Sequence, residues 1–302
     1  MTNLRVGLDL GGTKSAVLAE TLDGRRVVDT VVPSEDWDVE PLESGAAYID
    51  ALLKATLPED AVVVALGIGA QGLDTAEIAR EFEGELARLG YRSHCVNDAA
   101  LLVPAAGLDR GIGLIAGTGA IGVGATADGS PLITGGWGWV IGDEAGAAGL
   151  VREATKAALL AHDDGHRDDG LLGALLRAFD VDSAERLARA VNDEPTMDNW
   201  GPAAPAVFAA ADAGSALAST VIERGARHLA RLVDQLVRRG AVGTDVVAAG
   251  SVIVGQPRLS DAVRRLVTER HPSFTVHLLI DPPVVGALAL ARELPPAIAT
   301  KE

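Results

Sequence analysis

Two short glycine-rich segments carry residue types suited to holding an anion. Residues 9–14 read DLGGTK and residues 116–119 read AGTG, each directly after a hydrophobic run. Glycine has no side chain to shield the backbone N–H groups, so a phosphate can approach them closely. Thr13 and Thr118 add a hydroxyl to each turn, and Asp9 offers a carboxylate that would orient magnesium beside the phosphate. Either turn alone is compatible with a plain hairpin, but two such turns in one chain favour phosphate binding.

The second glycine turn also matches a dinucleotide-binding pattern. Residues 117–122 read GTGAIG, which fits G-x-G-x-x-G. That fingerprint needs a helix straight after the turn, because the helix N-terminus holds the pyrophosphate. Residues 120–129, AIGVGATADG, alternate as a strand does and end in an Asp-Gly turn. We therefore reject a dinucleotide site, and the chain contains no G-x-x-x-x-G-K-[ST] P-loop pattern either.

Asp98 is the residue best placed to act as a general base. It follows a predicted strand at 92–96 and precedes a predicted helix, so it could equally cap that helix. The two roles are compatible, since a capping carboxylate can still accept a proton from a ligand. Asp281 occupies a similar place before Pro282, and we assign it a structural role at the start of a helix.

Two further segments have unusual compositions. Residues 135–146 read GGWGWVIGDEAG. Trp137 and Trp139 could pack in a core, but the glycines predict a loop, and an aromatic loop with a carboxylate such as Asp143 is typical of a sugar site. Residues 248–255 read AAGSVIVG after a predicted strand. These small residues would let a flat ring approach the backbone, so an adenine shelf and a plain turn both stay open.

The elements that must position these residues recur along the chain. The first half predicts strands at 4–10, 15–21 and 25–32, a helix at 41–56, a strand at 61–67, a helix at 75–89, a strand at 92–96 and a helix from residue 98. The second half repeats that order in RGIGLIAGTG, AIGVGATADG, DVVAAGSVI and FTVHLLIDPPVVGALALA. We therefore predict an α/β fold with two duplicated domains and a ligand cleft between them. The domains span 1–108 and 109–302, with a helical insertion at about 144–240 in the second, and a C-terminal helix near 284–296 packs back on the first.

Composition narrows the classes of function. The chain has 302 residues, 48% of them hydrophobic, and a formal net charge of −16, which disfavours nonspecific binding to nucleic acid or anionic membranes. The single cysteine, Cys95, excludes a disulfide framework and a cysteine metal cluster within the chain. We see no secretory leader and no apolar run of bilayer length, so we expect a soluble cytoplasmic protein.

Five segments carry a resemblance to known families. LDLGGTKS, IAGTGAIG and VVAAGSVI resemble the two phosphate motifs and the adenosine motif of the sugar kinase/Hsp70/actin superfamily. VNDAALLVPAAG and GGWGWVIGDEAG resemble its N-acetylglucosamine kinase branch, the BadF/BadG/BcrA/BcrD ATPase group. DLGGTK also looks like the ROK sugar kinases, but those usually carry a zinc-binding cysteine cluster. Dehydratase-activating members of the BadF group need paired cysteines, which Cys95 alone does not provide.

The resemblance implies two ribonuclease H-like domains of the actin-like ATPase fold and an ATP-dependent kinase that phosphorylates the 6-hydroxyl of N-acetylglucosamine. Asp98 would be the base, and Asp9 would hold Mg²⁺ through a water molecule. The implied ligand contacts are Gly11, Gly12, Thr13, Lys14, Gly117, Thr118 and Gly119 for ATP phosphates; Gly250 and Ser251 for adenosine; and Asp36, Trp37, Gln71, Asn97, Asp98, Gly136 and Asp143 for the sugar.

Two alternatives to this function remain open, one with a different sugar substrate and one without catalysis. Amino-sugar kinases of this group tend to have an asparagine in the loop that here reads VPSEDWDVEP, which has none. The alternative sugar substrate is therefore glucosamine, or another hexosamine or hexose. A carboxylate in that loop suits a free ammonium better than an acetamide. A non-catalytic regulator that binds ATP and sugar is the alternative of another class. We expect a homodimer.

Overall fold

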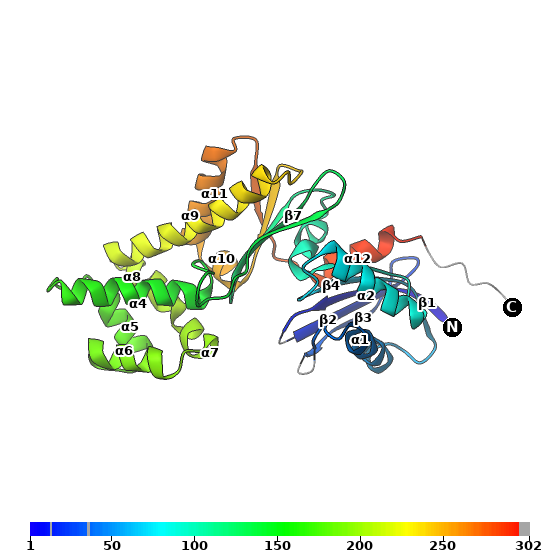
Figure 1. Ribbon diagram of the computed structural model, residues 1–302, viewed down its shortest axis with the longest axis horizontal. Coiled ribbons are helices and arrows are strands. Elements are labelled where there is room, and N and C mark those ends of the chain that lie inside the picture. The colour runs from blue at the N-terminus through cyan, green and yellow to red at the C-terminus, as the bar shows by residue number, and fades with distance from the viewer. Residues whose placement is uncertain (13, 35–36, 296–302) are drawn as a thin grey trace. The chain divides into compact units, whose positions relative to one another are not determined.

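The computed structural model describes residues 1–12, 14–34 and 37–295 (Figure 1). It divides into two compact units. Unit 1 contains residues Met1–Gly113, Gly124–Pro131 and the chain from Leu279 onward, and unit 2 contains Leu114–Val123 and Leu132–Leu278. The domain boundary predicted between residues 108 and 109 stays a prediction, as does the cleft.

Unit 1 is built on a five-stranded sheet in the order β3-β2-β1-β4-β5. Strand β1 pairs antiparallel with β2 and parallel with β4, and β4 pairs parallel with β5. The carboxyl ends of β1, β4 and β5 therefore lie along one edge of the sheet. The strands are β1 (Thr2–Leu10), β2 (Lys14–Thr21), β3 (Arg26–Pro33), β4 (Ala61–Ala70) and β5 (Ser93–Asn97).

Helices cover this sheet and complete its core. They are α1 (Leu42–Thr56), α2 (Ala76–Arg88), the 3-10 helix η1 (Asp98–Leu101), α3 (Leu102–Ala105) and α12 (Val284–Glu293). Leu8 and Ile68 of the sheet share one buried cluster with Ile49 of α1 and Phe82 of α2. The alternating and β-branched strand sequences thus bury one face of the sheet against amphipathic helices.

Helix α12 packs directly on β1 and β4, although more than 270 residues separate it from β1. The contact is possible because both strands have glycine there. A Cβ added to Gly7 would lie 2.4 Å from the backbone nitrogen of Leu288, and one added to Gly67 would lie 1.9 Å from the carbonyl oxygen of Ala287. Helix α12 begins at Val284 with Pro283 as its N-cap, so the structural role assigned to Asp281 at a helix start is wrong.

An ion pair links the last turn of α12 to strand β2. Arg292 donates from Nε and Nη2 to the Glu20 carboxylate at 2.8 and 2.6 Å. The Glu20 side chain is 3% exposed, and its hydrogen bonds from Arg292 hold its pKa below the usual value. The pair therefore contributes stability above the unfolded pKa of Glu20, and that contribution is lost as the pH falls through the lower, folded pKa.

We expect Arg292→Ala to lower the free energy of unfolding at neutral pH by about 1–3 kcal/mol, because it leaves a buried carboxylate without its main partner. Urea denaturation measures this change, and the loss should shrink in acid as Glu20 takes up a proton. Arg88→Ala is the matched control, since Arg88 pairs with Glu85 on the surface, where such a pair contributes little. Equal losses for the two variants would contradict the assignment.

Unit 2 repeats the sheet of unit 1. Its five strands run in the order β10-β9-β6-β7-β8, which read from β8 is the third-second-first-fourth-fifth order of unit 1. This confirms the predicted α/β fold with two like sheets. The strands are β6 (Ile112–Ala116), β7 (Ala120–Ala125), β8 (Pro131–Gly135), β9 (Asp245–Ala249) and β10 (Thr275–Leu278).

Most helices of unit 2 lie between β8 and β9 (green to yellow in Figure 1). They are α4 (Ala147–Asp163), α5 (Leu171–Ala178), α6 (Ala184–Asp193), α7 (Met197–Trp200), η2 (Gly201–Ala203), α8 (Ala204–Asp212) and α9 (Ala216–Arg238). After β9 come α10 (Ser251–Gly255) and α11 (Pro257–Arg270).

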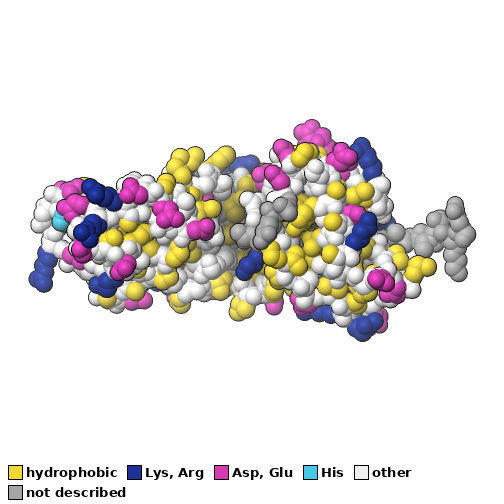
Figure 2. All heavy atoms as spheres, turned by 90° about the horizontal axis from the view of Figure 1, so that it is seen from below, with side chains coloured by type: hydrophobic (Ala, Val, Ile, Leu, Met, Phe, Trp, Pro, Cys, Tyr) yellow, Lys and Arg dark blue, Asp and Glu magenta, His cyan; other side chains and the backbone are white. Residues whose placement is uncertain are grey.

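Two properties of the structure concern the predicted lack of binding to nucleic acid and to membranes. Figure 2 shows that on the face in view acidic and basic side chains of the described residues are interspersed, without a broad basic patch. Within the described part of the chain, no single helix is long and apolar enough to cross a membrane. One bent pair, Met197–Asp212 with Ala216–Arg238, passes that test by length and composition only.

Candidate active site

The edge of the unit 1 sheet where β1, β4 and β5 end collects most of the residues predicted to act there. Asp9 lies near the end of β1, Gln71 follows β4, and Asn97 and Asp98 lie where β5 passes into η1. The turn after β1 is closed by a hydrogen bond from the backbone N–H of Gly11 to the carbonyl of Lys14 at 3.1 Å. Because β1, β4 and β5 are parallel neighbours, their carboxyl ends bring these residues together, as expected for a ligand site of an α/β sheet.

The glycine turn of unit 1 lies against the loop after β4. A Cβ added to Gly12 would lie 2.9 Å from Oε1 of Gln71, so only glycine lets this side chain rest on the turn. Gly12 is exposed, as is Lys14, the first residue of β2. Thr13 lies outside the described residues. The exposed part of the turn can thus present its backbone to a ligand.

Asp98 and Asp9 form a close pair of partly buried carboxylates. Burial and then the charge of Asp98 raise the pKa of Asp9 to about 7. Burial likewise raises the pKa of Asp98, with a further contribution from Asp74, while its hydrogen bond from the backbone N–H of Ala99 opposes the rise. A raised carboxyl pKa beside a glycine turn is typical of a group that handles protons or a cation.

Asn97, and not Asp98, is the residue that caps η1. Its Oδ1 accepts from the N–H of Ala99 at 3.0 Å, and Oδ1 of Asp98 accepts from the same N–H at 2.8 Å. The Asn97 amide also donates from Nδ2 to Asp74 at 2.9 Å. Asn97 therefore has one N–H left for a ligand. Asp74 was not among the predicted site residues, although its position as a polar residue after a parallel strand at the same edge was a signal.

The pKa of Asp9 predicts an unusual dependence of stability on pH. In the folded chain its pKa, about 7, lies above the usual 3.8, so folding favours the protonated form. Its contribution is fully present below the unfolded pKa and is lost as the pH rises toward 7. With magnesium removed by EDTA, we expect Asp9→Asn to melt at a higher temperature than the parent at pH 8.

That difference should close as the pH is lowered toward the unfolded pKa of the carboxyl group, because both side chains are then neutral. Thermal melts over a pH series measure it. Glu59→Gln, which neutralises an exposed carboxylate, is the control and should show no such trend. A melting difference for Asp9→Asn that is constant with pH would contradict the raised pKa.

Unit 2 brings its own glycine turn against the start of α10. Gly250 has a φ of 107°, and a Cβ there would lie 2.5 Å from the carbonyl oxygen of Ala116. The predicted phosphate turn and the predicted adenosine segment, Gly250 with Ser251, thus touch through backbone atoms. Gly117 is buried, Thr118 is exposed, and Ser251 is exposed as the first residue of α10. Strand β7 follows Gly119 directly, which confirms that no helix follows this turn as a dinucleotide site requires.

Asp143 lies behind this same turn and is 6% exposed. A Cβ on Gly119 would lie 2.8 Å from Oδ2 of Asp143, while Oδ1 is buried and has no hydrogen-bond partner among the described residues. Burial raises the pKa of Asp143, and the backbone N–H of Ala120 opposes the rise. With a φ of 55°, Asp143 adopts a left-handed conformation that is uncommon outside glycine. A buried acceptor without a partner is a group that a ligand hydroxyl can satisfy.

The tryptophans separate into different environments. Trp139 packs on Trp200 with ring centroids 4.8 Å apart, whereas Trp137 is 75% exposed. Trp37, predicted to bind sugar, packs against Tyr48 at 5.5 Å beside the core of unit 1. Gly136 is exposed with a φ of 71°. Asp36 lies outside the described residues.

No group of three or more histidine, cysteine or acidic side chains within the described ranges is arranged to hold a metal. Magnesium usually keeps several waters and binds one or two carboxylates together with substrate phosphates, so it does not need such a cage. The partly buried Asp9 and Asp98 fit that requirement, because a bound cation would offset the repulsion from Asp98 that helps to raise the pKa of Asp9.

Comparison with known proteins identifies the family. The model of the BadF/BadG/BcrA/BcrD ATPase family matches residues 6–291. The chain belongs to this family. As a member of an ATPase family it uses ATP, which agrees with the glycine turns described above.

Individual members and neighbours are distant. The chain is 26% identical to the N-acetylmuramic acid/N-acetylglucosamine kinase of Clostridium acetobutylicum, over 95% of this chain and 97% of that protein. It is 24% identical to the N-acetyl-D-glucosamine kinase of Dictyostelium discoideum, over the same shares. A Chromobacterium violaceum crystal structure, of a protein proposed to be an N-acetylglucosamine kinase, has a TM-score of 0.68 and 24% identity, over 95% and 98% of the two chains. This last likeness confirms the fold.

Proposed function

We propose that this BadF/BadG/BcrA/BcrD family member is an ATP-dependent kinase that transfers the γ-phosphoryl group of ATP to the 6-hydroxyl of N-acetylglucosamine. The observation that carries the proposal is the pair of carboxylates, Asp9 and Asp98, beside the glycine turn at one sheet edge. Both relatives named above are kinases of N-acetylated amino sugars.

Asp98 is the general base of the proposal. Its carboxylate would accept the proton of the sugar 6-hydroxyl as that oxygen attacks the γ-phosphorus and the bond to the β-γ bridging oxygen breaks. Oδ1 is held by the N–H of Ala99, so the carboxylate is kept in one orientation. The sugar would also contact Gln71, Asn97, Gly136 and Asp143, and the residues Asp36 and Trp37 stay part of the predicted sugar set.

The nucleotide contacts are mainly backbone groups. The turns at Gly11–Lys14 and Gly117–Gly119 would donate N–H groups to ATP phosphates, and Gly250 with Ser251 would border the adenosine. These fixed donors offset the charge on the transferring group, which is where most of the rate of phosphoryl transfer arises. Magnesium, when bound near Asp9, would supply further positive charge next to the phosphates.

A coupled assay of ADP release tests the proposal directly. The panel contains N-acetylglucosamine, N-acetylmuramic acid, glucosamine and glucose, with mass spectrometry of the product to locate the phosphate. We expect the largest kcat/KM for N-acetylglucosamine. ATP binding without turnover of any sugar would favour a non-catalytic regulator instead.

Glucosamine is the second candidate because the loop VPSEDWDVEP contains acids and no asparagine. A carboxylate there would favour a free 2-ammonium over an acetamide. Fast turnover of glucosamine with none of N-acetylglucosamine would establish that candidate. The expected homodimer stays a prediction, which gel filtration with light scattering tests.

A further inference from the structure

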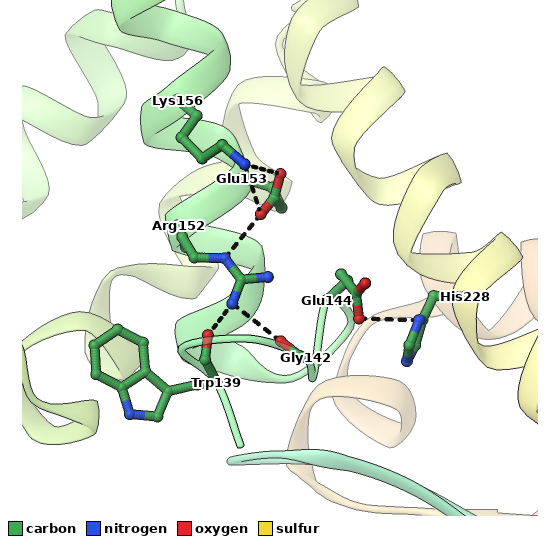
Figure 3. A network of polar contacts seen from close by, with 7 residues as sticks. All are labelled: Trp139, Gly142, Glu144, Arg152, Glu153, Lys156 and His228. Atoms are coloured by element: carbon green, nitrogen blue, oxygen red, sulfur yellow. Dashed lines mark hydrogen bonds and ion pairs between the residues drawn. The ribbon is translucent and has the colours of Figure 1, made fainter. Parts of the chain in front are cut away.

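Arg152 of α4 holds the backbone of the loop that leads to Asp143 (Figure 3). Its side chain is 15% exposed. From Nη1 it donates to the carbonyl of Trp139 and, at 3.0 Å, to the carbonyl of Gly142. Val140 and Ile141, between those carbonyls, are 67% and 80% exposed, so their own side chains do little to fix the loop.

The guanidinium is itself held in place from the other side. Nε donates to Oε1 of Glu153 at 2.8 Å, and Glu153 in turn pairs with Lys156 at 3.0 Å. The planar guanidinium can face a carboxylate and two carbonyls at once because its donors diverge in one rigid plane. A lysine at this position would keep the charge but could not reproduce that arrangement.

The far end of the loop has a second attachment, on α9. Glu144 pairs with Nδ1 of His228 at 2.9 Å, and the His228 side chain is 14% exposed. Burial lowers the pKa of His228, while Glu144 opposes this and Arg231 and Arg152 add to it. Asp143 therefore lies between two attachments from different helices, with its Oδ1 buried and unpartnered within the described part of the chain.

We propose that Arg152 is a positioning residue for the sugar site, which fixes the turn Trp139–Gly142 so that the Asp143 carboxylate faces a sugar hydroxyl. This inference rests on the proposed function. Without the two carbonyl contacts the loop loses its side-chain attachment to α4, so the backbone that leads to Asp143 is less restrained. Arg152 contacts the loop and Glu153, so its replacement should act through Asp143 and change the affinity for the sugar rather than the affinity for ATP.

The first test compares Arg152→Lys with Lys156→Met. Lys156 belongs to the same charged network but does not contact the loop, which makes it the matched control. In Arg152→Lys we expect faster amide hydrogen exchange across residues 137–146 and a KM for the sugar raised about ten- to a hundredfold, the range for losing hydrogen bonds from a charged group. The KM for ATP should stay at the parental value, and Lys156→Met should match the parent in every measurement.

A second variant keeps the test decisive if Arg152→Lys folds poorly. Arg152→Ala should show the same raised sugar KM, and added methylguanidinium should restore part of the affinity, which a general loss of stability would not allow. Unchanged exchange in the loop, or faster exchange with an unchanged sugar KM, would overturn the inference. If the parent phosphorylates no amino sugar, the proposed function fails, and the exchange data together with calorimetry of sugar binding still decide whether Arg152 holds this site.

Discussion

Asp98→Asn should lower kcat by about two to four orders of magnitude, the contribution expected of a general base. Asparagine has nearly the same shape and its amide oxygen can still accept from the N–H of Ala99, so η1 should keep its geometry. The variant loses the negative charge of the carboxylate and with it the capacity to take a proton. Steady-state kinetics with N-acetylglucosamine measure the loss, and calorimetry should show magnesium-ATP binding close to that of the parent.

Asp281→Asn is the matched control for this variant. Asp281 follows β10 in the sequence as Asp98 follows β5, but it is exposed and does not cap α12. The control should therefore leave kcat and the melting temperature unchanged. Turnover of Asp98→Asn within about tenfold of the parent would remove Asp98 from the role of base, since general bases contribute more than that.

The repeated sheet could be predicted because each of its signals is local. The Asp-Gly turns, the strand alternation and the position of each glycine turn all depend on neighbouring residues, and they recur in the same order in both halves. In a parallel sheet the carboxyl ends of neighbouring strands then lie along the same edge. Gln71 and Asn97 entered the predicted site only through the family resemblance, and the exact cap of η1 was not predicted.

The attachments around Asp143 could not be predicted, because they depend on packing between distant segments. Arg152 and His228 lie on helices whose sequences show only amphipathic periodicity, and nothing local distinguishes them from other surface arginines and histidines. The same holds for the tryptophans. Trp139 packs on Trp200 because α7 contacts α4, whereas Trp137 remains exposed. The roles of the side chains in this loop could be assigned only from the tertiary structure.

At Asp281 the internal duplication of the sequence gave a wrong prediction. Its resemblance in position to Asp98 led us to expect a helix starting directly after it, but Pro283 is the N-cap and α12 starts at Val284. The helix is placed by the glycines of β1 and β4 that admit its backbone, not by a cap. A duplicated pattern therefore preserves the strands better than the residues that follow them.

Gly119→Val should weaken binding of magnesium-ATP by about ten- to a hundredfold, the range for losing hydrogen bonds to a charged group. Gly119 lies in the turn between β6 and β7, and its backbone has no positive φ that would itself forbid valine. The added Cβ would lie 2.8 Å from Oδ2 of Asp143, so the side chain must move either that carboxylate or the turn. A displaced turn no longer presents its backbone donors to phosphate.

Isothermal titration with magnesium-ATP and with NADH measures the effect. Gly84→Val is the matched control, since a Cβ at Gly84 on α2 meets open space and valine there should leave the nucleotide affinity unchanged. NADH should give no binding heat with the parent or with either variant, because a strand and not a helix follows the turn. If Gly119→Val keeps the parental affinity for magnesium-ATP while it melts as the parent does, this turn does not hold the phosphates, and the nucleotide contacts must lie elsewhere in the chain.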